Sequence, residues 1–481
     1  MKAWFAHILF HTGMQPQRPA IVLMDRAITY GMLADGIDRC ARQLVALDLG
    51  GAAPVAVAVK SPLRQMVLSL ALMRIGIASL TLEDISAAPG DMKFSVALCD
   101  AGITPSVGTG HRFVTVPDAW FEPDGSYETA LPPGFAGTDQ VCRYSLTSGS
   151  TGEPRLFSDT IASFGTRVFS NIFGGIDASH NGVLCMLGLS TTFGFANACA
   201  TLAAGRTLYL ADSSGQAIAM IELFSIDFLL ASTEQVLALA GTARRTGAQV
   251  RSLRTIVMGG NVPTRTLLEA AMTFLCRDIL CQYGATEIGL IARARGRDVL
   301  SAPGLVGFVV PGVEVEIVDA TGKSCAAGQI GSIKVRHILD SDTLGICTDA
   351  TWKTLGDFGW FAPDGRLYVS GRTTEAVTEA RISPALEAEH LLRMECEYDD
   401  AAALMDNAAA AGTKPVVQIG IVNNRGATAE RLATLLSARG IGVDVELYDL
   451  KFIPRGAGGK VNRVELKLAL AAAKKIARSP R

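Results

Sequence analysis

Residues 144–155 gather hydroxyl groups, two glycines and a positive charge into one short segment, Tyr-Ser-Leu-Thr-Ser-Gly-Ser-Thr-Gly-Glu-Pro-Arg. Glycine lets the backbone approach a ligand closely, and successive backbone N–H groups with Ser and Thr hydroxyls can surround a polyphosphate. The segment is not a Walker loop, because no Gly-Lys-Ser/Thr follows at the required spacing. A flexible Gly/Ser linker is the alternative interpretation. The candidate phosphate contacts are Thr147, Ser148, Gly149, Ser150, Thr151, Gly152 and Arg155.

A second candidate motif, Tyr-Gly-Ala-Thr-Glu at residues 283–287, follows the apolar stretch 278–281. An aromatic ring offers a face on which a nucleotide base can stack, and a carboxylate oxygen suits Mg²⁺ beside phosphates. The alternative for this motif alone is an ordinary junction between a strand and a turn.

Two further motifs lie nearer the C-terminus. Asp357 follows a glycine in Leu-Gly-Asp, and a buried aspartate after such a turn can accept hydrogen bonds from both hydroxyls of a ribose. Lys460 lies in the glycine-rich stretch 454–463, and a lysine on such a loop can be delivered to a site on another domain. The alternative for Lys460 is a solvated basic loop.

The four motifs together resemble those of the AMP-forming adenylate synthetase superfamily, which includes acyl-CoA synthetases, peptide-synthetase adenylation domains and luciferases. They occur in the order found in that superfamily, and weaker similarities extend the resemblance from about residue 20 to about residue 466. A single short motif can arise by chance, whereas an ordered set is specific. The set therefore favours a phosphate loop over a linker at residues 147–155.

The resemblance implies ATP and Mg²⁺ as cofactors, and an acyl-adenylate made from a small carboxylic acid with release of pyrophosphate. It assigns catalysis to Lys460, Glu287 and Thr286, with Glu287 holding Mg²⁺ and Thr286 at the α-phosphate. Thr374 would be a hinge about which the C-terminal part rotates. The other implied nucleotide contacts are Tyr283 at the adenine, Gly284 and Ala285 where the backbone approaches, and Asp357 and Arg372 at the ribose.

The expected acyl pocket departs from the superfamily pattern. Thr191 stands where many acyl- and aryl-CoA synthetases carry an aromatic or histidine gate, so Phe193 or Phe195 would replace it. No aspartate occurs between Asp177 and Asp212 to pair with a substrate amine, which favours an apolar acyl or aryl acid. The candidate lining residues are Thr191, Phe193, Gly194, Gly259 and Gly260.

The segment after Arg372 departs further, because residues 373–383 lack the usual glycine and form a shorter loop. Relatives line their thiol tunnel with this loop. Coenzyme A is the expected acceptor, and the altered loop leaves two alternatives open. These are the phosphopantetheine of an acyl carrier protein and a nucleotide-binding homologue without catalysis.

Alternating helix and strand patterns predict an α/β fold of layered, doubly wound subdomains in an N-terminal adenylation domain, residues 1–371. Stretches 313–318 and 331–336 predict a small β-barrel-like subdomain within it. The more polar residues 372–481 predict a smaller, mobile α+β domain that carries Lys460.

Size and composition limit the remaining possibilities. The 481 residues carry a net charge of −2, which gives no electrostatic sign of nucleic-acid binding. Ten cysteines occur without a Cys-x-x-Cys pair, so they are expected as small buried side chains in a reducing cytoplasm. No apolar run approaches the ~20 residues of a membrane span, and the N-terminus lacks the features of a signal peptide.

Overall fold

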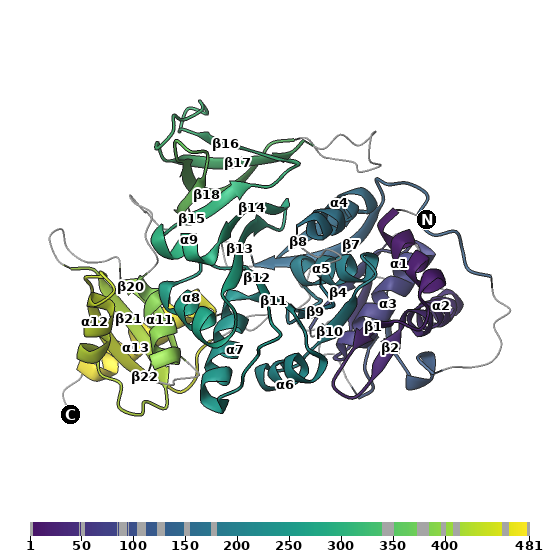
Figure 1. Ribbon diagram of the computed structural model, residues 1–481, viewed down its shortest axis with the longest axis horizontal. Coiled ribbons are helices and arrows are strands. Elements are labelled where there is room, and N and C mark those ends of the chain that lie inside the picture. Colours follow the sequence, from purple (N-terminus) through teal and green to yellow (C-terminus); the bar gives the residue numbers. More distant parts are fainter. Residues whose placement is uncertain are drawn as a thin grey trace.

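The computed structural model of the chain is shown in Figure 1. It describes residues 3–47, 49, 53–83, 85, 94, 96–102, 112–122, 130–148, 154–174, 180–338, 351–372, 384–395, 401–406, 414–454 and 461–478. Two large sheets with helices between and beside them form most of the molecule, and a smaller three-stranded sheet with its own helices follows near the C-terminus. The predicted α/β class with layered subdomains is confirmed.

The largest sheet has thirteen strands, in the order β16-β17-β18-β19-β15-β14-β13-β12-β11-β9-β10-β1-β2. Its central strands are parallel. They consist of buried runs of β-branched residues and leucine, because helices cover both faces of the sheet. These strands are β1 (Pro19–Val22), β9 (Gly182–Cys185), β10 (Thr207–Leu210), β11 (Phe228–Ser232), β12 (Thr255–Gly259) and β13 (Asp278–Ala285), with β2 (Ala27–Thr29) antiparallel at the edge.

The predicted small β subdomain is present as antiparallel strands that continue this sheet beyond β13. Alternating buried and half-buried residues along the strands match one face packed on a core and one face outside. The strands are β14 (Gly289–Arg295), β15 (Leu305–Val309), β16 (Val313–Val318), β17 (Gly331–His337), β18 (Lys353–Phe361) and β19 (Leu367–Arg372).

The second sheet has six strands, β6-β5-β3-β4-β7-β8. All neighbours are parallel except β7 and β8, which form an antiparallel hairpin. The predicted phosphate loop, residues 147–155, includes the ends of these two strands, and its residues 149–153 lie outside the described part of the chain. The strands are β3 (Val55–Ala58), β4 (Ser79–Thr81), β5 (Val96–Cys99), β6 (Arg112–Thr115), β7 (Val141–Ser148) and β8 (Pro154–Thr160).

Helices α1–α5 fill the space between the two sheets and share one hydrophobic core with them. Their ends follow local sequence signals: α3 begins after the cap Ser61 with a proline in its first turn and ends at Gly76, whose φ of 79° suits glycine. The helices are α1 (Ala3–Met14), α2 (Tyr30–Ala46), α3 (Pro62–Ile75), α4 (Ile161–Phe173) and α5 (Thr192–Ala203), with the short helix η2 (Asp118–Trp120) beside α2.

A second core covers the opposite face of the thirteen-stranded sheet. It is built from α6 (Ser214–Phe224), α7 (Thr233–Thr246), α8 (Arg265–Phe274) and α9 (Gly296–Ser301). Among the described helices, none is both long and apolar enough to cross a bilayer. All eight cysteines in the described ranges are free, and seven of them are buried, as the composition predicted.

Residues beyond β19 form the small sheet β20-β21-β22 and its helices. Strand β21 pairs antiparallel with β20 and parallel with β22. The helix α11 packs on this sheet and also contacts α7 and α8 of the larger part (Figure 1). The elements are α11 (Pro384–Glu395), β20 (Ala401–Asp406), β21 (Val416–Val422), α12 (Ala429–Ser437), β22 (Asp444–Leu450) and α13 (Arg463–Arg478). The domain boundary at 372 stays a prediction.

Candidate functional site

The predicted site segments lie at the carboxyl ends of parallel strands. The acyl-loop residues follow β9, Gly260 follows β12, and the Tyr283 motif closes β13. These strands run parallel in one sheet, with β11 between β12 and β9, so their carboxyl ends lie along one edge. Ligands of open α/β sheets bind at this edge.

The β7–β8 hairpin pairs Thr147 with Arg155 and Ser148 with Pro154 across its last register positions. The ladder between β7 and β8 therefore holds the two ends of the predicted phosphate loop next to each other. Four predicted contacts lie outside the described residues, as do the hinge and the catalytic lysine. They are Gly149, Ser150, Thr151, Gly152, Thr374 and Lys460.

The turn between β13 and β14 is tightly constrained. A Cβ atom on Gly284 would lie 2.4 Å from the carbonyl oxygen of Gly289, so only glycine fits there. The ladder also shifts register between Tyr283 and Gly284. Irregularities of this kind re-aim side chains and are frequent beside active sites.

Neighbouring segments hold the same turn by its backbone carbonyls. The Nη2 atom of Arg167 donates to the Thr286 oxygen at 2.6 Å, and His337 Nε2 lies 3.0 Å from the Ile288 oxygen. Burial lowers the pKa of His337, with the positive charge of Arg167 acting in the same direction. The Glu287 side chain is exposed and the Thr286 side chain is half-buried.

Tyr283 and Asp357 meet across the sheet. The Tyr283 hydroxyl donates to Asp357 Oδ2 at 2.7 Å. Asp357 is buried beside Gly356, whose φ is 75°, at an irregular point of β18, and it lies opposite Arg372 in the β18–β19 ladder. The structure therefore brings the Tyr283 and Asp357 side chains into contact and places Arg372 opposite Asp357 in the ladder. The sequence did not suggest the direct phenol–carboxylate bond, because nothing local links the two positions.

Magnesium fits this arrangement in one way. Within the described residues, no group of three or more His, Cys, Asp or Glu side chains could enclose a metal ion. Glu287 offers a single exposed carboxylate, and Mg²⁺ is commonly held by one or two carboxylates together with substrate phosphates. The residues present therefore fit a metal that arrives with a nucleotide.

Thr191 caps α5. Its Oγ1 accepts from the Gly194 N–H at 3.0 Å and donates to the Gly188 oxygen at 2.8 Å. A Cβ atom on Gly194 would lie 2.2 Å from that same oxygen, so glycine is required where the loop meets the helix. The local geometry thus gives Thr191 a capping role, while a gating role for it stays a prediction.

The two candidate phenylalanines lie in different surroundings. Phe193 is half-buried, and its Cε1 lies 3.6 Å from the position of a Cβ atom on Gly259. Phe195 is fully buried and packs against the Phe164 ring, 5.7 Å between centroids. Of the two phenylalanines, Phe193 therefore lies at the strand ends, and Phe195 belongs to the core between the sheets.

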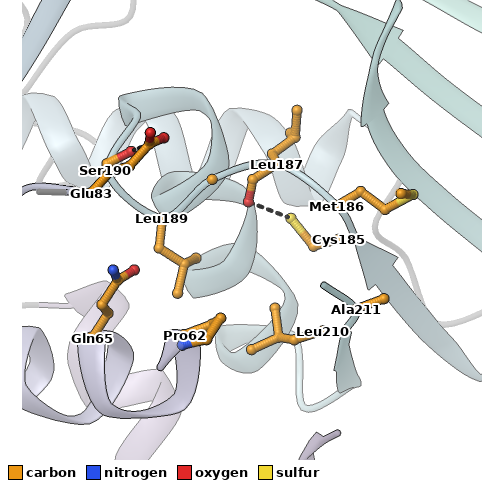
Figure 2. A pocket seen from close by; sticks show the side chains of 11 residues that line it. Pro62, Gln65, Glu83, Cys185, Met186, Leu187, Leu189, Ser190, Leu210 and Ala211 are labelled. Atoms are coloured by element: carbon orange, nitrogen blue, oxygen red, sulfur yellow. Dashed lines mark hydrogen bonds between the residues drawn. The ribbon is translucent and has the colours of Figure 1, made fainter. Parts of the chain in front are cut away.

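A pocket of about 130 Å³ lies next to this loop, between the carboxyl ends of β9 and β10 and the start of α3 (Figure 2). Ser190 Oγ donates to Glu83 Oε1 at 3.2 Å on its wall. The candidate lining residues named from the sequence include none of this wall, although carboxyl strand ends are a general signal for such a pocket. The other lining residues are Pro62, Gln65, Cys185, Met186, Leu187, Gly188, Leu189, Leu210 and Ala211.

A protein-family model described as AMP-binding enzyme matches residues 11–338. The chain belongs to this family, so the predicted superfamily membership is confirmed.

The relatives extend this result. The chain is 30% identical to 4-coumarate–CoA ligase-like 6 of Oryza sativa over 264 residues, which is 52% of this chain and 44% of that protein. It matches 65% of the rice 4-coumarate–CoA ligase 2 at 26% identity, and so spans less than two thirds of both rice relatives. Indoleacetate–CoA ligase of Aromatoleum aromaticum is 26% identical over 96% of this chain and 97% of its own length.

Solved structures share the fold. An o-succinylbenzoate CoA synthetase of Bacillus subtilis in complex with its acyl-adenylate superposes with a TM-score of 0.77 at 19% identity, covering 96% of this chain and 97% of that one. The anthranilate CoA ligase AuaEII in complex with anthranoyl-AMP gives 0.77 at 17% identity, covering 99% and 98%. The similarity at these identities establishes a common fold.

Proposed function

We propose that this protein is an AMP-forming acid–thiol ligase that activates an apolar aryl or acyl carboxylic acid and passes it to coenzyme A. The observation that carries the proposal is the meeting of Tyr283 with the buried Asp357 beside a turn in which glycine is required. An aromatic face, an acceptor for ribose hydroxyls and a close backbone approach are what a nucleoside requires.

The first step forms a bond between a carboxylate oxygen and the α-phosphorus of ATP. The bond from that phosphorus to the bridging oxygen breaks, and pyrophosphate leaves with the electron pair. Residues 147–155 would hold the β- and γ-phosphates, with Glu287 beside Thr286 at the α-phosphate. Mg²⁺ supplies charge neutralisation when bound with ATP. Lys460 would stabilise charge developing at the α-phosphate and the substrate carboxylate.

The acid is expected to be apolar and preferably aromatic. Phe193 lies against the Gly259 backbone at the strand ends, and no aspartate occurs between Asp177 and Asp212 to pair with an amine. Several relatives are named for arene-containing acids, among them indoleacetate and 4-coumarate. This similarity supports an aryl acid without identifying it.

The second step transfers the acyl group from the adenylate to a thiol and releases AMP. Coenzyme A is the proposed acceptor, in line with the names of the relatives. A carrier-protein phosphopantetheine is the second candidate, because residues 373–383 lack the glycine of the loop that lines the thiol tunnel in relatives.

The test is acid-dependent exchange of labelled pyrophosphate into ATP, screened over aryl, fatty and amino acids. Exchange with aryl or apolar acyl acids is the expected result. Exchange with amino acids alone would contradict the proposed pocket, and no exchange with any acid would overturn the ligase assignment. Positive acids are then offered with coenzyme A and with carrier proteins in parallel.

A further inference from the structure

Arg143 is a charged side chain in an otherwise apolar core. It lies on β7, the strand that leads into the predicted phosphate loop, and is 1% exposed. Its Nη1 donates to Thr81 Oγ1 at 3.0 Å and its Nη2 to the Leu189 oxygen at 2.6 Å. The guanidinium carbon lies 3.8 Å from the centroid of the Phe195 ring. Arg143 thus ties the phosphate hairpin to the acyl loop and to α5.

A second tie leaves the same hairpin in the other direction. Asp159 on β8 lies opposite Arg143 in the ladder and is also 1% exposed. Directly opposed residues of an antiparallel pair point to the same face. Asp159 Oδ1 accepts from Arg167 Nε at 2.8 Å, and Arg167 Nη2 donates to the Thr286 oxygen at 2.6 Å. The hairpin is therefore linked to the nucleotide turn as well, through α4, which lies beside β7 and β8 in Figure 1.

We call Arg143, Asp159 and Arg167 the Arg143 row. The charges of these three residues do not cancel. Two guanidinium groups face one carboxylate, and no carboxylate of the described part of the chain lies within ion-pairing distance of Arg143. Arg143 Nε and Asp159 Oδ2 are buried without a hydrogen-bond partner there. Burial lowers the pKa of Arg143 to about 10, so it remains charged at neutral pH. Apolar residues of similar volume would often be at least as stable at such positions.

We propose that the Arg143 row is a positioning relay that holds the acyl loop and the nucleotide turn at one fixed spacing from the phosphate hairpin. Its atoms contact neither proposed ligand directly, and they act through the Leu189 and Thr286 carbonyls and the Phe195 ring. The proposal rests on the proposed function, because the reaction that the row would serve is the proposed acid activation. A carboxylate and an α-phosphate must meet in one orientation, and a displacement of about 1 Å can cost about 10²-fold in rate.

The experiment is a double-mutant cycle with Arg143→Met and Arg167→Met. The control is Arg39→Met, because Arg39 also donates to a backbone carbonyl, that of Phe121, and also has a buried Nε without a partner. Each row variant is expected to lower kcat of pyrophosphate exchange about 10- to 10²-fold. The kcat of the double variant should fall little further than that of the single variant with the larger loss. The control should keep its kcat. Independent losses that multiply would overturn the relay.

Amide hydrogen exchange on the free proteins gives a second measurement that needs no turnover. Arg143→Met is expected to accelerate exchange at residues 284–290, and Arg167→Met at residues 187–195, that is, at the far end of the row in each case. Acceleration confined to the near end would overturn the proposal. If the wild-type protein exchanges pyrophosphate with no acid, the proposed function fails, and the hydrogen-exchange result still decides the relay. Should a Met variant fail to fold, the Lys variants keep the charge without the two-pronged geometry and enter the same cycle.

Discussion

The Arg143 row and the interface of α11 with α7 and α8 both bury charged side chains, yet they join different kinds of structure. The row lies within one continuous core and ends on the backbone carbonyls of two loops. The α11 interface joins residues on opposite sides of the predicted boundary at 372. We call its members Glu234, Glu387, His390 and Arg393 the α11 clasp.

The clasp combines two carboxylates, an imidazole and a guanidinium group. Glu387 is 0% exposed and accepts from the backbone N–H groups of Arg265 and Thr266, both at 3.1 Å, and so caps the start of α8. His390 Nδ1 lies 2.6 Å from Thr264 Oγ1, and Glu234 pairs with Arg393. Each of these contacts involves a side chain of α11, so all of them lie where α11 packs on α7 and α8.

The difference suggests two roles for buried charge. Guanidinium groups stay charged at all physiological pH values, and in the row they are buried beside the core that the two large sheets share. The clasp can separate as a surface, since α11 keeps its own core with α12 and the small sheet. A fixed spacing suits the row, and a releasable contact suits the rotation predicted about residues 372–374.

The largest expected effect is the loss of stability when the row loses its only carboxylate. Asp159→Ala removes the ion-pair partner of Arg167 and leaves that guanidinium group buried without a counter-charge, which should cost about 3–5 kcal/mol in the free energy of unfolding. Urea unfolding followed by tryptophan fluorescence measures it. The control is Asp227→Ala, a buried carboxylate that accepts from the Asn181 N–H, for which about 1–3 kcal/mol is expected. Equal losses of stability in the two variants would show that Asp159 contributes no more than another buried, hydrogen-bonded carboxylate.

The next effect tests whether the C-terminal part reaches the site that the row organises. Lys460→Ala should lower acid-dependent pyrophosphate exchange by about 10²–10³-fold, because one preorganised charge at the α-phosphate is lost. ATP binding, measured by calorimetry, should persist, since the nucleoside contacts come from Tyr283 and Asp357. Wild-type exchange in this variant would refute the role of Lys460.

The clasp should respond to its own substitution without harm to the row. Glu387→Ala removes the carboxylate that accepts two backbone N–H groups of α8, and leaving such donors buried costs about 1–3 kcal/mol. Amide exchange should rise along the start of α8 and on α11. Glu389→Ala is the matched control, because Glu389 is equally buried but accepts from Ala403 N within the small sheet. Increased exchange at α8 in both variants would show that the clasp is not a separate contact.

Much of the fold could be predicted from local signals, because its elements carry them. The run at 54–59 predicts β3, and the pattern from Arg64 to Ile75 with Gly76 as a stop predicts α3. The structure ends α3 there but begins it earlier, at Pro62, after the cap Ser61. Helix α1 was missed: its apolar run places Trp4 and Ile8 in the core but leaves Phe10 exposed, so no clear polar face marks a helix. Strands at 313–318 and 331–336 were predicted, while their continuity with the parallel sheet was not, since strand order is a long-range property.

The candidate site was predictable where a motif is contiguous and not where it depends on distant partners. Gly284 and Gly194 were singled out from the sequence, and the structure shows why only glycine fits at each. Neither Arg143 nor Arg167 was singled out, because their partners Leu189 and Thr286 lie far along the chain. A charged residue inside the apolar strand 141–146 was the one local sign that something unusual is buried there.

The smallest expected effect is a pH response of the clasp. Burial opposes ionisation of Glu234, but hydrogen bonds and charges from His390 and Arg393 outweigh it and lower its pKa from 4.5 to about 2. The folded pKa lies below the unfolded one, so the stabilisation is complete above the ordinary value and is lost as the pH falls from there toward 2. Because 38% of the side chain is exposed, solvent screening keeps the effect modest.

Pepsin cleavage within α11 measures this response at acidic pH, because Leu391 and Leu392 are fully buried while the helix is docked and folded. The wild-type cleavage rate should rise more between about pH 4.5 and about pH 2.5 than the rate of Glu234→Gln, whose neutral side chain no longer titrates. Taking the ratio of the two proteins at each pH removes the pH dependence of pepsin itself. A constant ratio would mean that protonation of Glu234 does not loosen the clasp.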